Sequence, residues 1–252
     1  MIIPKYPFIR SVSLKRDAVP SFKRYPFNLP CVAGLTQLEL HPAVTFFVGE
    51  NGSGKSTLLE AIAVRFGFNA EGGSKNFNFS TRETHSELHE HLFLDRGIAR
   101  ATDGYFLRAE SFYNVASQVD DLGAGGYGGT SLHEQSHGEA FLSLITNRFQ
   151  GEGVYLLDEP EAALSPLRQM SVLSYLHRLV YHHSQLIIAT HSPILLAYPQ
   201  AWIYQFSESG IARVNYTDTE HYQVTKDFLN RPERMMEILL GNEERDLKKT
   251  ER

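Results

Sequence analysis

The stretch GENGSGKST at residues 49–57 lies between the apolar run VTFFV and a segment of helical periodicity. Residues 55–66 are predicted to form a helix that Gly67 ends, because apolar side chains recur there on one stripe. That stripe consists of Leu58, Leu59, Ile62 and Phe66. Glycines between a strand and a helix let the backbone adopt positive φ angles and approach an anion closely, and a helix N-terminus attracts negative charge. The stretch therefore predicts a phosphate-binding loop.

The spacing Gly49-x-x-x-x-Gly54-Lys55-Ser56 matches the P-loop pattern, and its setting of strand, loop and helix matches as well. In such loops the lysine neutralises the β- and γ-phosphates, and the hydroxyl of the next residue binds Mg²⁺. We therefore expect ATP and Mg²⁺ here, with Lys55 in a catalytic role and Ser56 as a metal ligand. The predicted nucleotide-binding residues are Gly49, Asn51, Gly52, Ser53, Gly54, Lys55, Ser56 and Thr57. The full motif in this setting disfavours the alternative, a glycine-rich turn without a ligand.

The composition is that of an ordinary globular protein with one large domain: 252 residues, 42% hydrophobic, and a net charge of −5. The sequence has no apolar run of about 20 residues, the length that a membrane-spanning helix needs. Its N-terminus lacks the pattern of a signal peptide. A single cysteine, Cys31, excludes an internal disulfide framework and fits a reducing compartment. These features predict a cytoplasmic location.

The first 34 residues are locally basic although the chain as a whole is acidic. Their charged residues are Lys5, Arg10, Lys15, Arg16, Lys23 and Arg24, against Asp17 alone. A solvated face is the favoured interpretation of such a run, and contact with nucleic acid is the alternative.

Strands that alternate with helices predict an α/β fold with a mainly parallel central sheet and an antiparallel N-terminal portion. We expect one domain over residues 1–240, an insertion at about 67–135 with a possible short helix at 86–94, and a charged flexible tail at 241–252. The strands are expected at residues 8–14, 35–40, 44–48, 104–112, 154–157 and 186–190, with a hairpin of 202–206 and 211–214. A helix that Ser165 caps is expected from Pro166 to His183, with Leu167, Met170, Leu173, Leu176 and Val180 on its apolar stripe.

Two carboxylates, Asp158 and Glu159, follow the apolar strand at residues 154–157. Ligands bind at the carboxyl ends of strands in open α/β sheets. Asp158 is therefore expected to hold Mg²⁺, and Glu159 to act as a general base on the attacking water. A strand end followed by a helix cap is the plain alternative. His191 follows the next apolar strand and is expected at the same sheet edge, where an imidazole can contact the γ-phosphate.

The sequence His133-Glu134-Gln135-Ser136-His137 is a literal H-E-x-x-H, the signature of zinc peptidases. That chemistry needs both histidines along one established helix. The preceding residues, GAGGYGGTS, are too rich in glycine to form one, and Ser136-x-x-Glu139 instead resembles a capping box that begins a helix. Zinc catalysis is therefore disfavoured.

Taken together, these motifs resemble those of ABC-class ATPases. Residues 49–57 resemble Walker A, residues 156–159 Walker B, and His191 the switch histidine. Ser136-His137-Gly138-Glu139 occupies the place of the ABC signature, with His137 in place of a glycine, and residues 161–165 occupy that of the D-loop. The segments DEPEAALSP and ATHSPILL are most similar to the corresponding segments of the SMC/RecF/OLD-type ATPases and their small stand-alone relatives. The resemblance covers residues 35–199.

The resemblance also implies a Q-loop, for which Glu110 is the best candidate and a further Mg²⁺ ligand. Glu110 precedes Ser136 by only 26 residues (136 − 110). This spacing leaves little room for the helical subdomain through which transporter subunits of the class couple to a membrane protein.

The family further implies a head-to-tail homodimer, in which Lys55 and Ser56 of one copy face Ser136, Gly138 and Glu139 of the other across ATP. The favoured function is an ATP-hydrolysing, dimerising switch in nucleic-acid maintenance or defence, with DNA, RNA or a repair or defence protein as partner. The alternative is the ATP-binding subunit of an ABC transporter with a separate membrane partner. An aromatic such as Tyr25 or Phe27 is expected either to stack on the adenine or to pack in the core.

Overall fold

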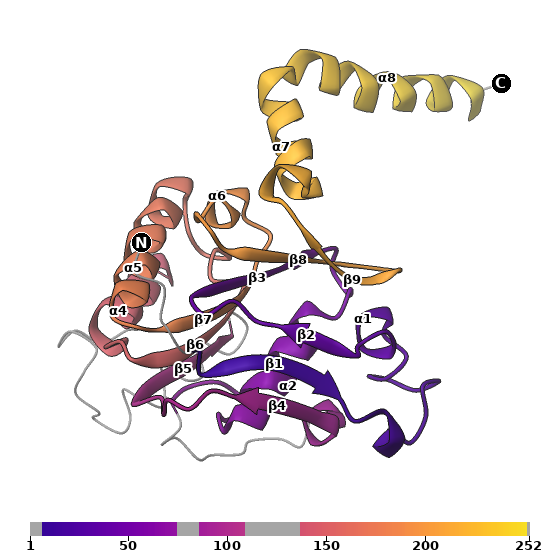
Figure 1. Cartoon of the computed structure of the whole chain (residues 1–252). Coiled ribbons are helices and arrows are strands. Elements are labelled where there is room, and N and C mark those ends of the chain that lie inside the picture. Colours follow the sequence, from indigo (N-terminus) through magenta and orange to yellow (C-terminus); the bar gives the residue numbers. More distant parts are fainter. Residues whose placement is uncertain (1–6, 75–85, 109–136, 251–252) are drawn as a thin grey trace.

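The computed structural model describes the backbone of residues 7–74, 86–108 and 137–250, and their side chains except at 137–138 and 242–250 (Figure 1). Most of the insertion expected at about 67–135 lies outside these ranges. The described part combines a six-stranded and a three-stranded sheet with helices. None of the described helices has both the length and the apolar character that a membrane crossing needs.

The six-stranded sheet has the order β5-β6-β7-β3-β8-β9. Its strands are β3 (Val44–Gly49), β5 (Asp103–Arg108), β6 (Gly153–Asp158), β7 (Gln185–Ala189), β8 (Trp202–Ser207) and β9 (Gly210–Val214). All neighbours pair in parallel except β8 and β9, which form the expected hairpin. Every residue of β3, β6 and β7 is buried, as near-continuous apolar runs predict for strands covered on both faces. The mainly parallel central sheet is confirmed.

A second, antiparallel sheet has the order β2-β1-β4, formed by β1 (Ile9–Leu14), β2 (Gln37–Glu39) and β4 (Leu92–Arg96). It confirms the antiparallel N-terminal portion. The sequence did not predict β4, because a short helix was expected over residues 86–94. The structure has only one such turn, η2 (Glu87–His91), which Ser86 caps by accepting a hydrogen bond from the Leu88 N–H. Buried Leu92 and Leu94 then alternate with exposed Phe93, the period of a strand.

The elements stack in layers, with helix α2 (Lys55–Phe66) between the two sheets and α4 (His137–Arg148) and α5 (Pro166–Tyr181) on the far side of the six-stranded sheet (Figure 1). The short helix α1 (Pro30–Ala33) packs on the α2 side of the six-stranded sheet, and the short helix α6 (Pro193–Leu196) packs on the side of α4 and α5. The buried amide of Gln185 also links the sheets. It accepts a hydrogen bond from the Ile9 N–H at 2.9 Å and donates to the carbonyls of Ile9 and His41 at 2.8 and 3.0 Å.

Helix α5 begins as expected, with Ser165 accepting a hydrogen bond from the Arg168 N–H. The prediction of its apolar stripe was partly wrong. Leu167 and Met170 are 70% and 50% exposed. Burial starts one turn later and includes Val172, Leu176, Leu179 and Val180. Helical periodicity fixes which residues share a face, but tertiary neighbours decide how far along the helix that face is covered.

Two helices follow the hairpin, α7 (Glu220–Asn230) and α8 (Pro232–Thr250), and the sequence predicted neither. Figure 1 shows α7 rising from the end of the hairpin and α8 running away from both sheets. None of the α7 side chains is buried. The backbone of α8 continues through residues 241–250, where a charged flexible tail was expected; the domain boundaries stay a prediction.

Candidate functional site

The loop at residues 49–54 joins β3 to α2 and needs glycine at three places. Gly49, Gly52 and Gly54 have φ angles of 148°, 80° and 94°, in the region that L side chains avoid. A Cβ at Gly49 would collide with the backbone of Phe206, and one at Gly54 with the sulfur of Cys31. The loop therefore has both the conformation and the close packing that only glycine permits here.

The Lys55 side chain is buried, and its ammonium group lies against the backbone of the preceding loop. Nζ donates hydrogen bonds to the carbonyl oxygens of Gly49 and Glu50 at 2.8 and 2.9 Å. Burial lowers the pKa of Lys55, while the nearby carboxylates of Glu159 and Asp158 act in the opposite direction. The loop thus holds a cation at its mouth, where an anion would meet it.

Ser56 and Asp158 meet across the gap between α2 and β6, because Ser56 Oγ donates a hydrogen bond to Asp158 Oδ1 at 2.9 Å. Mg²⁺ prefers oxygen ligands and usually takes only one or two from the protein, with water and substrate phosphates supplying the others. Within the described ranges no group of three or more His, Cys, Asp or Glu residues is placed to hold a metal ion. A hydroxyl paired with one carboxylate fits Mg²⁺ bound together with a nucleotide.

Glu159 has a φ of 50°, a left-handed conformation that is uncommon for a residue with a side chain. Its N–H donates to the carbonyl of Ala189 in β7 at 2.9 Å, which fixes the turn after β6. Its carboxylate is 41% exposed, and Oε1 lies 3.6 Å from His191 Nε2. Strained conformations of this kind concentrate at functional sites.

His191 follows β7 and lies beside Glu159, so the expectation that both lie at one sheet edge matches the geometry. Two of its partners were not predicted as site residues. Glu161 Oε1 accepts a hydrogen bond from the His191 N–H at 2.6 Å, and His221 Nε2 lies 3.0 Å from His191 Nδ1. Burial raises the pKa of Glu161 and lowers those of His191 and His221. Glu161 follows the acid pair closely in sequence, whereas nothing in the sequence points to His221.

Comparison with known protein families gives two matches that cover the site between them. A family model described as "AAA domain" matches residues 26–109, which include the loop and α2. A second, described as "AAA domain, putative AbiEii toxin, Type IV TA system", matches residues 85–197, which include Asp158, Glu159 and His191. Both matches are to AAA-type ATPase domains, which agrees with the resemblance to ABC-class P-loop ATPases.

Three solved structures resemble the chain. One is described as "An inward-facing conformation of a putative metal-chelate type ABC transporter", with 18% identity, a TM-score of 0.46, and coverage of 86% of this chain and 87% of that one. CbiO1 of Clostridium perfringens, part of the ABC transporter complex CbiONQ, has 16% identity, a TM-score of 0.43 and coverage of 81% and 90%. An SMC head bound to the C-terminal winged-helix domain of ScpA has 15% identity, a TM-score of 0.42 and coverage of 71% and 91%. None of the curated proteins matches the chain significantly.

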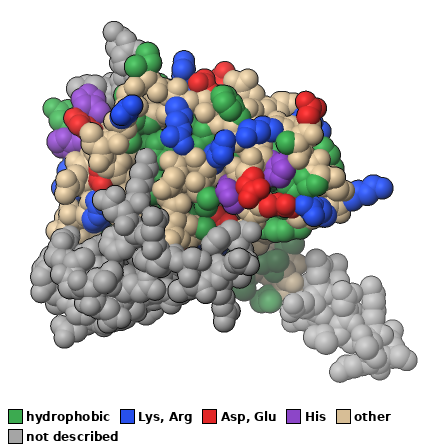
Figure 2. All heavy atoms as spheres, turned by 90° about the horizontal axis from the view of Figure 1, so that it is seen from below, with side chains coloured by type: hydrophobic (Ala, Val, Ile, Leu, Met, Phe, Trp, Pro, Cys, Tyr) green, Lys and Arg blue, Asp and Glu red, His purple; other side chains and the backbone are tan. Residues whose placement is uncertain are grey.

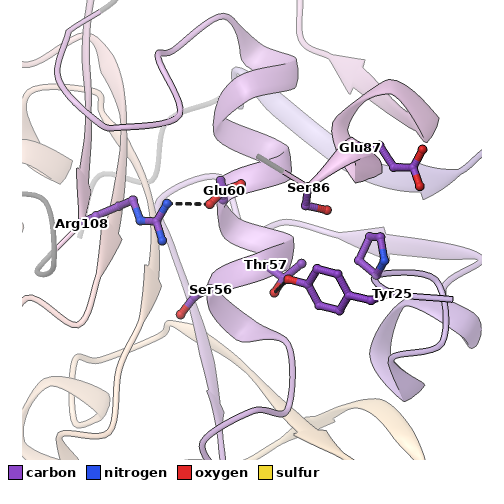
Figure 3. A pocket seen from close by; sticks show the side chains of 8 residues that line it. Tyr25, Ser56, Thr57, Glu60, Ser86, Glu87 and Arg108 are labelled. Carbon is purple, nitrogen blue, oxygen red and sulfur yellow. Dashed lines mark hydrogen bonds and ion pairs between the residues drawn. The ribbon is translucent and has the colours of Figure 1, made fainter. Parts of the chain in front are cut away.

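A pocket of about 510 Å³ lies beside the first turn of α2 (Figure 3). Tyr25 is 60% exposed there, and its hydroxyl lies 3.3 Å from Thr57 Oγ1. Arg108 and Glu60 form an ion pair of 2.6 Å on the opposite wall. Phe27, the other aromatic considered for the adenine, is fully buried and packs edge-on against His91. The structure thus separates the two aromatics into an exposed ring beside the loop and a core residue.

The remaining predicted site residues are placed as follows. Asn51 is exposed, and Ser53 Oγ is buried with no hydrogen-bond partner among the described residues. Gly138 lies in the first turn of α4, and Glu139 pairs with Arg168 of α5 at 3.1 Å. Outside the described residues lie Glu110, Ser136, and His133 and Glu134 of the H-E-x-x-H sequence. The side chain of His137 is not described either.

Several of the basic residues near the N-terminus have partners. Arg10 pairs with Asp95 at 3.2 Å and Arg24 with Glu87 at 2.6 Å, and Arg16 donates to a backbone carbonyl. Figure 2 shows the face seen from below, where basic side chains lie in the company of acidic and histidine side chains. This pairing favours the solvated face over a basic nucleic-acid surface at these positions.

Proposed function

We propose that the chain hydrolyses ATP in the presence of Mg²⁺ and that ATP binding joins two copies head to tail. The observation that carries the proposal is the meeting of a glycine-built loop, a buried lysine, a serine–aspartate pair and a glutamate–histidine pair at one edge of the sheet. Phosphoryl transfer depends mainly on positioning and on charge stabilisation, and these residue types supply both.

Each residue would have one task in the reaction. Lys55 would neutralise phosphate oxygens, together with the N–H groups at the start of α2. Glu159 would accept the proton of the attacking water, because its carboxylate is partly open to solvent. His191 would donate from Nε2, which is hydrogen-bonded to none of the described groups. Ser56 and Asp158 would hold Mg²⁺, which when bound supplies positive charge to the phosphates.

The adenine end is assigned to Tyr25, by its exposure and its position over Thr57. An exposed aromatic ring can stack on a base of any type, and base stacking contributes about 1–3 kcal/mol. This position leaves the base on one side of α2 and the phosphates at its N-terminus.

The second copy would complete the site from α4. Gly138 and Glu139 lie at the beginning of that helix, whose N-terminus offers donors and positive potential to the phosphates of a facing subunit. Loss of the γ-phosphate would remove this ligand between the copies and loosen the dimer.

The decisive experiment compares Glu159→Gln with the wild type in Mg·ATP by size-exclusion chromatography with light scattering. The variant should lose ATP hydrolysis while retaining ATP binding, so its mass should double from the 28.5 kDa of one chain. Lys55→Ala is the matched control and should stay monomeric, because it lacks the cation that holds the phosphates. A Glu159→Gln variant that binds ATP and remains monomeric would argue against the head-to-tail dimer.

We infer a role in nucleic-acid maintenance or defence from the similarity of DEPEAALSP and ATHSPILL to SMC/RecF/OLD-type ATPases, and from the family description that names a Type IV toxin–antitoxin toxin. The pairing of Arg10 and Arg24 directs the search for a nucleic-acid contact away from that face. ATPase assays with DNA, RNA or lipid vesicles test the role. Stimulation by DNA or RNA supports it, and stimulation by vesicles alone supports the transporter alternative.

A further inference from the structure

His191 and His221 share one hydrogen bond in the candidate site. His191 Nδ1 and His221 Nε2 are 3.0 Å apart, and the ring centroids are separated by 5.1 Å. The opposite nitrogen of His191, Nε2, is directed at Glu159 Oε1, 3.6 Å away. The imidazole of His191 therefore has a histidine at one nitrogen and a carboxylate near the other.

This arrangement selects one of two tautomers. Between two neutral imidazoles, only one of the facing nitrogens carries the proton. If His191 Nδ1 carried it, His191 Nε2 would direct a lone pair at the Glu159 carboxylate, which is repulsive. If His221 Nε2 carries it, His191 keeps its own proton on Nε2, where the carboxylate attracts it.

The neutral state of both rings follows from their surroundings. Burial lowers the pKa of His191 and of His221, and the cation of Lys55 lowers both further. His191 Nε2 and His221 Nδ1 are buried and find no hydrogen-bond partner within the described parts of the chain. The N–H at His191 Nε2 is therefore a donor without a partner among the described groups, and a phosphate oxygen would accept its hydrogen bond.

His221 is fixed by the first turn of α7. Thr219 is fully buried, accepts a hydrogen bond from the Tyr222 N–H at 3.3 Å, and donates to the carbonyl of Tyr216 at 2.8 Å. The Tyr216 hydroxyl in turn donates to the carbonyl of Pro193, two residues after His191. The start of α7 is therefore anchored to the segment that carries His191.

We propose that His221 is a positioning residue, whose Nε2–H donates to His191 Nδ1 and so keeps the His191 proton on Nε2, facing the phosphate. The inference rests on the proposed ATPase function. It makes ATP hydrolysis depend on the placement of α7, an element outside both sheets. A hydrogen-bonded partner selects the tautomer of histidines in metal and catalytic sites in the same way.

The test compares His221→Leu with His221→Gln in steady-state ATPase assays. Leucine removes the donor, and kcat should fall by about 10- to 100-fold, the usual effect of losing such a partner, while KM for ATP changes much less. Glutamine keeps an N–H donor and should restore most of kcat. Gln223→Leu, an exposed position two residues further along α7, is the matched control and should behave as wild type. Equal activity of the Leu and Gln variants, with both folded by circular dichroism, would overturn the inference.

A second measurement does not depend on turnover. Nitrogen NMR of the wild type, with His191→Gln for assignment, should show the His191 proton on Nε2, and His221→Leu should show a mixture of tautomers. A wild type with the proton on Nδ1 overturns the positioning role even if ATP is hydrolysed. A wild type with the expected tautomer but no ATPase activity would instead overturn the proposed function, so the two failures are distinguishable.

Discussion

At the scale of single residues, Tyr25 and Phe27 lie two positions apart in the sequence but differ in how far their rings are exposed. One ring is 60% exposed beside the loop, and the other is completely buried. We predict that Tyr25→Ala raises KM for ATP by about 5- to 150-fold, the equivalent of losing about 1–3 kcal/mol of base stacking, with kcat nearly unchanged. Tyr25→Phe keeps the ring and should stay close to wild type.

Phe27→Ala is the informative comparison, because it should reduce stability rather than affinity. Truncating a buried phenylalanine typically costs about 3–5 kcal/mol, which urea unfolding would detect. If Tyr25→Ala leaves KM unchanged, the ring does not contact the base.

The sequence was sufficient to predict Lys55, Ser56, Asp158, Glu159 and His191 as one group, because parallel strands deliver the residues after them to the same sheet edge. It was insufficient for Glu161 and His221. Glu161 acts through its contact with the backbone N–H of His191, and His221 comes from a helix whose contact with the site depends on tertiary structure. Neither contact produces a recognisable pattern of residue spacing in the sequence.

At the scale of elements, Asp103 joins β5, β6 and α4 at the end of the sheet remote from the loop. Its carboxylate accepts hydrogen bonds from Tyr155 Oη at 2.6 Å, Arg148 Nη1 at 2.8 Å and the Gln150 N–H at 3.0 Å. Burial by itself would raise the pKa of Asp103, but these hydrogen bonds outweigh it and hold the pKa below its usual range. A depressed carboxylate pKa stabilises the fold above the pKa of the unfolded chain, about 3.9, and that stability is lost as the pH falls through the folded value.

We predict that Asp103→Asn lowers the free energy of unfolding at pH 7 by about 1.5–3 kcal/mol, the range for hydrogen bonds to a charged group. The difference from wild type should begin to shrink as the pH falls below about 4, where the carboxylate of the unfolded chain becomes protonated, and should be lost as the pH falls through the lower pKa of the folded state. Urea titrations at several pH values measure both effects. Asp95→Asn, in the exposed pair with Arg10, serves as the control. A gap between Asp103→Asn and wild type that does not narrow at all as the pH falls from 5 to 3 would contradict the assignment.

The elements were predictable to the extent that a local pattern determines them. The helix at Lys55–Phe66 has its start and stop in the sequence, and the structure reproduces both. Strand β4 was not predictable, since Leu92–Arg96 is short and becomes a strand by pairing with β1. The exposed first turn of α5 likewise reflects what its neighbours cover.

At the scale of the whole molecule, two cores lie on opposite faces of the six-stranded sheet. One packs α2 and the antiparallel sheet against it, and the other packs α4, α5 and α6. Helices α7 and α8 contribute no buried residue that the structure describes to either core. Their exposed apolar residues are Val224, Phe228, Leu229, Met236, Ile238, Leu239 and Leu240. The structure therefore divides into a folded body and a helical arm.

This division predicts that α8 can be removed without loss of the body. A chain that ends at Arg231 keeps Thr219 and His221. Its thermal midpoint should therefore stay within about 3 °C of that of the full chain, about the shift that 1 kcal/mol causes in a domain of this size. Its far-ultraviolet circular dichroism should lose helical signal, and its kcat should be retained. A chain that ends at Asn215 also loses buried Thr219 and the hydrogen bond from His221 to His191. That shorter chain should lose kcat as His221→Leu does. If removal of α8 alone lowers the midpoint by many degrees, the arm supports the body, and the separation at Arg231 is wrong.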